Sequence, residues 1–208
     1  MAHGGTMTLL GIILAGGRAT RMGGGDKGLR MVAGQRLIDH VITRLSAQCT
    51  PLAINANGDP ARLAEFGLPI LPDSLPDHPG PLAGVLAGLD WAANLGATAI
   101  ITAAADTPFF PADLAVKLQE NAGPSGLCLA ASRDPMGKLH RQPTFGLWPT
   151  ALRHDLRAAL TGGLRKIVLW TDSHHAGTAE FVSHPFDPFF NINTPEDILE
   201  AETLMGQA

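Results

Sequence analysis

The segment TLLGIIL at residues 8–14, which runs into AGGRATRMGGGDKG at residues 15–28, decides the fold of this chain. A short continuous apolar run that ends in a glycine-rich loop is typical of a strand buried on both faces of a parallel sheet. After this loop, residues 36–45 carry apolar side chains three and four positions apart, which predicts a helix, and residues 51–55 predict a second strand. The N-terminal part of the chain therefore predicts a strand–helix–strand unit.

The alternation of strands and helices continues toward the C-terminus. Several prolines occupy first helical positions, and Thr194 before Pro195 is a strong cap for a last helix. Further helices are expected at 60–66, 81–96, 111–121, 150–160, 164–170 and 195–204, and further strands at 68–71, 99–104, 127–132, 143–148 and around residue 181. This order predicts one domain over residues 8–208, built on an open, mostly parallel α/β sheet that binds ligands beyond the carboxyl ends of its strands.

Composition excludes several classes of protein. The 208 residues include 15 Lys or Arg and 19 Asp or Glu, so the net charge is 15 − 19 = −4, and no basic run offers a surface for DNA or RNA. No stretch of about 18 apolar residues predicts a membrane span, and we interpret residues 1–7 as a disordered extension or a remnant of cloning. Cys49 and Cys128 suggest neither a disulfide framework nor a zinc site, and a cytoplasmic location fits this usage best.

The loop at residues 14–28 combines six glycines with three cations. Glycines let backbone amides approach a ligand closely, and Arg21 and Lys27 add positive charge, so this loop has the chemistry of a polyphosphate cradle. A flexible, solvated loop is the simpler alternative. Two common nucleotide motifs do not apply, because the G-x-G-x-x-G spacing at residues 23–28 begins well past the strand and because Lys27 is followed by glycine where a P-loop has Ser or Thr.

Four blocks of the sequence resemble those of one family, the molybdenum cofactor guanylyltransferases. The blocks are LAGGRATRMGGGDKGL at 14–29, DSLPDHPGPLAG at 73–84, DTPFFP at 106–111 and FNINTPED at 190–197. The resemblance implies a three-layer α/β/α Rossmann-like nucleotidyltransferase fold with a mostly parallel sheet. It also implies transfer of GMP from GTP to the terminal phosphate of Mo-molybdopterin, with release of pyrophosphate and with Mg²⁺ as cofactor.

The resemblance further implies roles for individual residues. Lys27, Arg21 and Asp106 are the implied catalytic residues, the two cations on the phosphates and the carboxylate on Mg²⁺. The implied binding residues, besides Lys27 and Asp106, are Leu14, Ala15, Gly16, Gly17, Asn55, Asp73, Gly80, Gly84, Asn191 and Asn193. Transient contacts with molybdenum insertion proteins or recipient apo-enzymes are implied as well.

The chemistry of Asp106 supports its implied role. It follows the buried strand predicted at 99–104, at the ligand end of the sheet. A carboxylate beside a triphosphate is best compensated by a hard divalent cation that takes oxygen ligands. The alternative is that Asp106 caps the helix expected to start near Pro111, although it lies several residues too early for that position.

Other candidate residues have simpler alternatives. Asp73 and Asp77 flank a proline-rich loop, in which Asp77 in particular favours turn formation. Gly80 is equally explained by ordinary helix initiation. Asn191 and Asn193 alternate along an extended segment, so at most one of them faces a common pocket unless the chain bends, and capping or turn formation is the alternative for both.

Rival functions stay open at this point. A cytidylyltransferase that acts on the same pterin, or a sugar-phosphate nucleotidyltransferase, would share the implied fold, although residues 14–17 are more similar to the guanylyl branch. A non-catalytic carrier of GTP or pterin belongs to a different class, and the retention of both Asp106 and Lys27 argues against it. The eight histidines lack metal-ligand spacing, which disfavours a zinc site.

Overall fold

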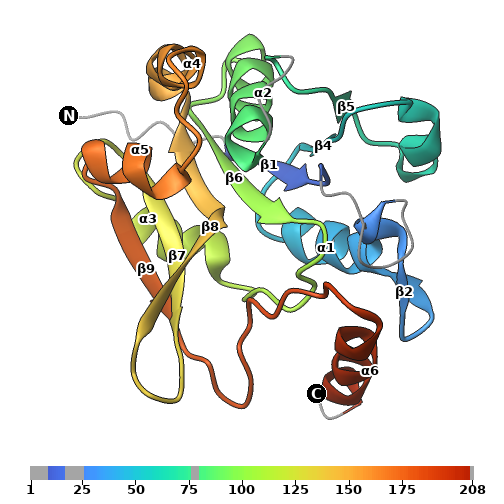
Figure 1. Cartoon of the computed structure of the whole chain (residues 1–208). Helices are drawn as coiled ribbons and strands as arrows, with labels where there is room; N and C mark the ends of the chain where they lie inside the picture. Colours follow the sequence, from blue (N-terminus) through green and yellow to red (C-terminus); the bar gives the residue numbers. More distant parts are fainter. Residues whose placement is uncertain (1–8, 17–25, 76–79, 207–208) are drawn as a thin grey trace.

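The computed structural model describes residues 9–16, 26–75 and 80–206. Within these ranges seven strands form one sheet in the order β5-β4-β1-β6-β8-β7-β9 (Figure 1). The strands are β1 (Leu9–Leu14), β4 (Leu52–Asn55), β5 (Ile70–Leu71), β6 (Ala99–Ala104), β7 (Cys128–Arg133), β8 (Leu139–Pro149) and β9 (Gly177–Phe181). Of these seven, β8 runs antiparallel to both of its neighbours and the other pairs are parallel, which confirms the predicted mostly parallel sheet.

Helices cover both faces of this sheet. They are α1 (Leu37–Ser46), α2 (Pro81–Asn94), α3 (Leu114–Glu120), α4 (Arg153–Thr161), α5 (Ile167–Ser173) and α6 (Pro195–Met205), with short 3-10 helices η2 (Lys27–Leu29), η3 (Pro60–Phe66) and η4 (Thr150–Leu152). Successive β1 residues face opposite ways: Ile13 packs in a buried cluster with α1 and α3, and Ile12 in a second cluster with α2, α4 and α5 (Figure 1). The arrangement is the expected three-layer α/β/α fold.

The position of β1 between β4 and β6 determines where the ends of these strands meet. Leu14, the last residue of β1, is in register with Asn55 of β4 and with Ala104 of β6. Because these three strands are parallel, their carboxyl ends lie at one edge of the sheet. The loops that carry the predicted site residues begin at this edge.

A small hairpin that the sequence analysis did not identify supports the C-terminal helix. It consists of β2 (Met31–Val32) and β3 (Gln35–Arg36), joined by Ala33 and Gly34, whose φ angles of 48° and 79° are those of a tight hairpin turn. Val32 is buried in a third cluster with Ala201 of α6. The hairpin therefore anchors α6 to the N-terminal half of the molecule.

The predicted boundaries of α3 and α5 are wrong by three residues. The helix expected from Pro111 begins at Leu114, because Gln48 holds the preceding turn: its Nε2 donates to the Pro111 oxygen at 3.0 Å, and its Oε1 accepts from the Ala115 amide at 2.9 Å. The helix expected from residue 164 begins at Ile167. Tertiary contacts with Gln48 thus decide the start of α3.

The strand predicted at 143–148 is longer than expected. β8 begins at Leu139 and pairs with β7 across a tight turn, in which Asp134 Oδ1 accepts from the Met136 and Lys138 amides, each at 2.9 Å. The register between the two strands shifts where Leu129 and Ala130 face β8. This bulge allows Pro143, which has no amide hydrogen, to lie inside a strand.

No helix within the described residues is long and apolar enough to cross a membrane. Cys49 and Cys128 are both buried and free.

Candidate nucleotide site

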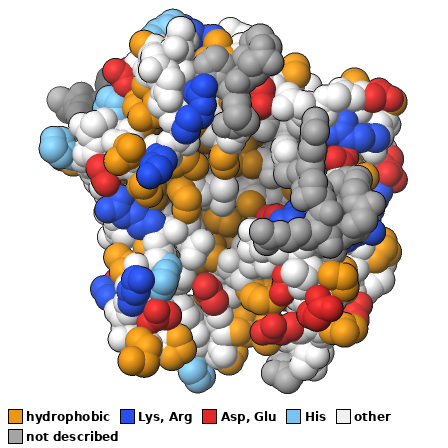
Figure 2. Space-filling model, in the orientation of Figure 1, with side chains coloured by type: hydrophobic (Ala, Val, Ile, Leu, Met, Phe, Trp, Pro, Cys, Tyr) orange, Lys and Arg blue, Asp and Glu red, His pale blue; other side chains and the backbone are white. Residues whose placement is uncertain are grey.

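The predicted glycine-rich loop follows β1, which lies between β4 and β6 in the sheet. The backbone oxygen of Leu14 accepts from the Ala105 amide at 3.1 Å, and the Ala15 amide donates to the backbone oxygen of Asn55 at 2.9 Å. Backbone pairing therefore continues one residue past β1, and Gly16 is the first exposed position. In the space-filling view this face of the molecule is hollowed near its centre, with hydrophobic side chains on the floor and charged side chains at the sides (Figure 2).

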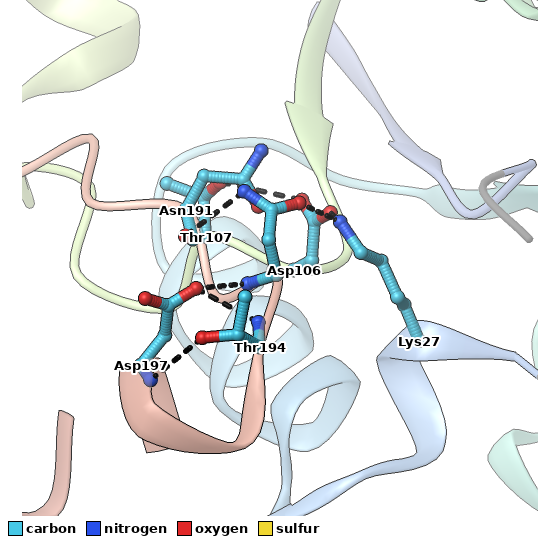
Figure 3. Close-up of polar contacts among 7 residues, drawn as sticks. Lys27, Asp106, Thr107, Asn191, Thr194 and Asp197 are labelled. Carbon is cyan, nitrogen blue, oxygen red and sulfur yellow. Dashed lines mark hydrogen bonds and ion pairs between the residues drawn. The ribbon is translucent and has the colours of Figure 1, made fainter. Parts of the chain in front are cut away.

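Three side chains from distant segments meet at the carboxyl edge of β6. The Lys27 ammonium lies 2.8 Å from Asp106 Oδ2 and also donates to Asn193 Oδ1 (Figure 3). The side chains of Lys27 and Asp106 are each 16% exposed, so the ion pair is largely shielded from water. The structure thus brings together two of the implied catalytic residues and one implied binding residue.

Close packing of η2 brings Lys27 to this position. Gly28 is buried, and a Cβ at this glycine would lie 3.1 Å from the Cβ of Ala105. This distance is shorter than most Cβ contacts, so a larger residue would require the neighbouring segment to shift by a few tenths of an ångström. The glycine next to Lys27 therefore allows η2 to pack closely on the segment that follows β6.

The segment before α6 is held to Asp106 by the backbone. Ile192 is fully buried, and its backbone amide donates to the backbone oxygen of Asp106 at 3.0 Å. Asp197 Oδ2 accepts from the amides of Asn193 and Thr194 at 2.6 and 2.8 Å, and Thr194 Oγ1 accepts from the Asp197 amide at 3.2 Å. This capping box confirms the predicted cap and fixes the backbone from which Asn193 reaches Lys27 (Figure 3).

The two asparagines of this segment make different contacts. The Asn193 side chain contacts Lys27, and its Nδ2 donates to the backbone oxygen of Asn191 at 3.3 Å. The capping alternative for Asp106 is wrong, because the residue at the N-cap of α3 is Asp113. Sequence analysis missed the contact of Asp197 with the Asn193 amide, which the T-x-x-D spacing at 194–197 could have indicated.

Asn55 and Asp73, two further implied binding residues, contact each other at the carboxyl end of β4. Asn55 is buried at the end of β4, and its Nδ2 donates to the Leu71 oxygen at 3.0 Å and to Asp73 Oδ1 at 2.9 Å. Gly84 of α2 packs directly on this amide: a Cβ there would lie 2.1 Å from Asn55 Oδ1. Gly80, at the N-cap of α2, is exposed and has φ +122°, which favours glycine.

Some predicted residues lie outside the described ranges. They are Gly17, Arg21 and Asp77. Within those ranges no cluster of three or more His, Cys, Asp or Glu could hold a metal ion. A metal at this edge would therefore depend on Asp106, on neighbouring amide oxygens and on oxygens of a bound substrate.

Known proteins are similar to this chain over most of its length. A family model described as a MobA-like NTP transferase domain matches residues 11–176. A molybdenum cofactor guanylyltransferase from Bradyrhizobium sp. is 50% identical over 204 residues, which cover 96% of this chain and 94% of the relative. The protein of the same name from Cereibacter sphaeroides is 48% identical over 200 residues, covering 96% and 98%.

Solved structures share the fold at much lower identity. Molybdopterin-guanine dinucleotide biosynthesis protein A from Archaeoglobus fulgidus aligns with a TM-score of 0.70 at 21% identity, covering 97% of this chain and 100% of that one. A 4-diphosphocytidyl-2C-methyl-D-erythritol synthase from Anaerococcus prevotii also reaches 0.70, at 14% identity and 96% coverage of both chains. Because the second name refers to a cytidyl group, the fold by itself does not select the nucleotide.

Proposed function

The chain belongs to the family of MobA-like NTP transferases, and from this premise we propose that it transfers GMP from GTP to the terminal phosphate of Mo-molybdopterin. It is a nucleotidyltransferase by membership of this family, and its guanylyltransferase relatives match it almost end to end. In the proposed reaction an oxygen of the pterin phosphate bonds to the α-phosphorus of GTP. The bond from that phosphorus to the oxygen shared with the β-phosphorus breaks, and pyrophosphate leaves.

One observation carries the proposal: Lys27, Asp106 and Asn193 meet at the ligand edge of a mostly parallel sheet. An ammonium in a partly buried position stabilises phosphate oxygens strongly, because little water competes for it. The implied role of Lys27 on the phosphates is therefore supported by its place beside the loop that follows β1. Arg21, a second cation of that loop, is proposed for the same role on the family resemblance alone.

The nucleophile needs no general base in this reaction. A phosphate monoester has a second pKa of about 6 and is largely ionised at neutral pH. Catalysis then consists of holding two anionic substrates in line and offsetting their charge. Lys27 supplies positive charge, and the capping box at Thr194 holds Asn193 in place beside it.

Mg²⁺ is the metal that fits these residues. The oxygens of Asp106 and Asn193 already converge on one cation, the Lys27 ammonium, and Mg²⁺ prefers oxygen ligands. Mg²⁺ commonly binds through one or two carboxylates and takes its other ligands from substrate phosphates and water, so one carboxylate suffices. We propose that Asp106 and Asn193 hold Mg²⁺, which when bound offsets the negative charge of the triphosphate.

We propose roles for the remaining implied residues on the two substrates. On the nucleotide side we propose Leu14, Ala15, Gly16, Gly17, Asn55 and Asp73. On the acceptor side we propose Gly80 and Asn191. The packing of Gly84 against Asn55 supports a different contribution for this glycine, because it makes room for the buried amide. A cytoplasmic location and transient contacts with recipient apo-enzymes complete the proposal.

The test is product formation by the purified protein. With GTP, Mg²⁺ and Mo-molybdopterin we expect stoichiometric pyrophosphate release and a guanine dinucleotide identified by mass spectrometry. CTP in place of GTP, and a sugar phosphate in place of the pterin, are the control reactions. Efficient turnover of either control would favour the rival nucleotidyltransferases, and GTP binding without pyrophosphate release would favour a carrier.

A further inference from the structure

Asp26 and Lys27 are neighbours in the sequence but contact different parts of the molecule. Lys27 pairs with Asp106, whereas the Asp26 carboxylate pairs with Nε of Arg62 in η3. The other two nitrogens of the Arg62 guanidinium also donate hydrogen bonds. Nη1 donates to the backbone oxygen of Asp59 at 2.6 Å, and Nη2 donates to the backbone oxygen of Asn57 at 2.7 Å. A planar guanidinium that holds three acceptors is fixed more firmly than a single ion pair.

Asn57, which Arg62 holds by its backbone, in turn holds Asp73. Its Nδ2 donates to Asp73 Oδ2 at 2.7 Å, and its Oδ1 accepts from the Asp73 amide at 2.9 Å. The other carboxylate oxygen of Asp73 accepts from Asn55. A continuous chain of hydrogen bonds therefore runs from Asp26 to Asp73 by way of Arg62.

This network also balances charge beside the proposed phosphate site. The Asp26 carboxylate is adjacent in sequence to Lys27, and without a partner its negative charge would oppose a polyphosphate bound there. Arg62 supplies the compensating positive charge. The side chains of Asp26 and Arg62 are 23% and 28% exposed, so solvent screens this pair only in part.

We propose that Arg62 is a positioning residue for the nucleotide, which ties the Lys27 side of the site to the Asp73 side and offsets the charge of Asp26. The inference rests on the proposed function, because it requires a nucleoside triphosphate between these two sides. Arg62 pairs with protein groups through all three of its nitrogens. Its removal should therefore affect nucleotide affinity and leave the chemical step nearly unchanged.

The experiment measures GTP binding by titration calorimetry, together with KM and kcat from pyrophosphate release. Arg62→Gln should raise Kd and KM for GTP by about tenfold, while kcat stays within about twofold. Arg62→Lys keeps the charge but loses the planar fork, and an intermediate increase is expected. Adding Asp26→Asn to Arg62→Gln removes the carboxylate that Arg62 offsets, so the part of the lost affinity that is due to charge should return, whereas the part due to the lost contacts with Asp59 and Asn57 should remain.

Arg133→Gln is the matched control, because it also breaks an arginine–carboxylate pair, with Glu180, on the β7–β8 hairpin. Its GTP affinity should equal that of the wild type. Wild-type affinity in Arg62→Gln would overturn the inference, and so would an affinity loss that Asp26→Asn does not relieve. If the wild-type protein itself binds no GTP, the proposed function fails instead, so the two failures are distinguishable.

Discussion

The Lys27 ammonium lies 2.8 Å from Asp106 Oδ2, although 79 residues separate the two in the chain. Its second acceptor, Asn193, is 166 residues away. Both acceptors are oxygens of the kind that a divalent cation would also take. Lys27 therefore shares its partners with the proposed metal, and nucleotide binding should transfer the lysine from these oxygens to phosphate.

Lys27→Ala should weaken GTP binding and slow transfer. A phosphate contact by a partly buried ammonium is worth about 2 kcal/mol, so kcat/KM should fall by about 30-fold or more. The melting temperature, recorded in parallel, separates this loss from the effect on stability of breaking a partly buried ion pair. Lys138→Ala, on the exposed β7–β8 turn, is the control and should retain full activity. Equal activity of Lys27→Ala and Lys138→Ala would refute the assignment.

Asp106→Asn separates shape from charge at the proposed metal ligand. The variant keeps an acceptor for Lys27 but removes the negative charge that attracts Mg²⁺. Turnover should fall by about two orders of magnitude or more, which corresponds to about 3 kcal/mol in the barrier, and the Mg²⁺ requirement should rise. Asp113→Asn, at the exposed start of α3, should match the wild type in a parallel Mg²⁺ titration. Near-normal turnover of Asp106→Asn at low Mg²⁺ would argue against a metal role.

The two asparagines before α6 should respond differently to removal of their side chains. Asn193→Ala takes away an acceptor of Lys27 and should lower kcat by about tenfold. Asn191→Ala keeps the backbone oxygen that Asn193 contacts, so any loss should appear in the KM for the acceptor. Kinetics with each substrate varied in turn make the comparison. Similar losses of kcat in both variants would contradict a specific contribution of the Asn193 side chain through Lys27.

Gly84→Ala should disturb nucleotide binding through Asn55. The added Cβ would lie 2.1 Å from Asn55 Oδ1, so the amide must move, and we expect a loss of about 1–3 kcal/mol in stability together with a higher KM for GTP. Gly88→Ala, one turn along α2, is the matched control: its Cβ would lie 2.6 Å from Ile12 Cγ1, in the core and away from Asn55. Both variants should melt at lower temperature. Only Gly84→Ala should change KM, and a shift in both would point to a general loss of packing.

The two thiols should be unreactive in the folded protein. Burial raises the pKa of Cys49 to about 12 and that of Cys128 to about 11, from an ordinary 9.0. A thiol reagent at pH 8 should therefore label neither cysteine until denaturant is added. Above pH 9 the unfolded chain loses the thiol protons that the folded protein keeps, because the folded-state pKa values are raised. The contribution of these thiols to the free energy of unfolding is therefore complete below pH 9 and declines as the pH rises above it. Rapid labelling of native protein would contradict this burial.

Local sequence patterns determined most of the architecture. The apolar run before the glycine-rich loop predicts β1, and proline and threonine positions predict α2 and α6, because burial of a strand and capping of a helix depend on neighbouring residues. The Asp106 position could also be predicted, since the end of a buried strand lies at the ligand edge. By contrast, the start of α3 depends on Gln48, whose side chain accepts a hydrogen bond from the Ala115 amide. The two residues are 67 positions apart in the chain, and local periodicity contains no information on such a contact.

The site was determined in part by sequence and in part by tertiary structure. Residue types and their order indicate a lysine for phosphate and a carboxylate for metal. Their convergence depends on the parallel register of β1, β4 and β6, which brings loops far apart in the chain to one edge of the sheet. The contact of Arg62 with Asp26 and Asn57 was decided by tertiary structure alone, because a long side chain on a short helix can point toward many partners. Packing selects among them, and the sequence pattern around Arg62 does not.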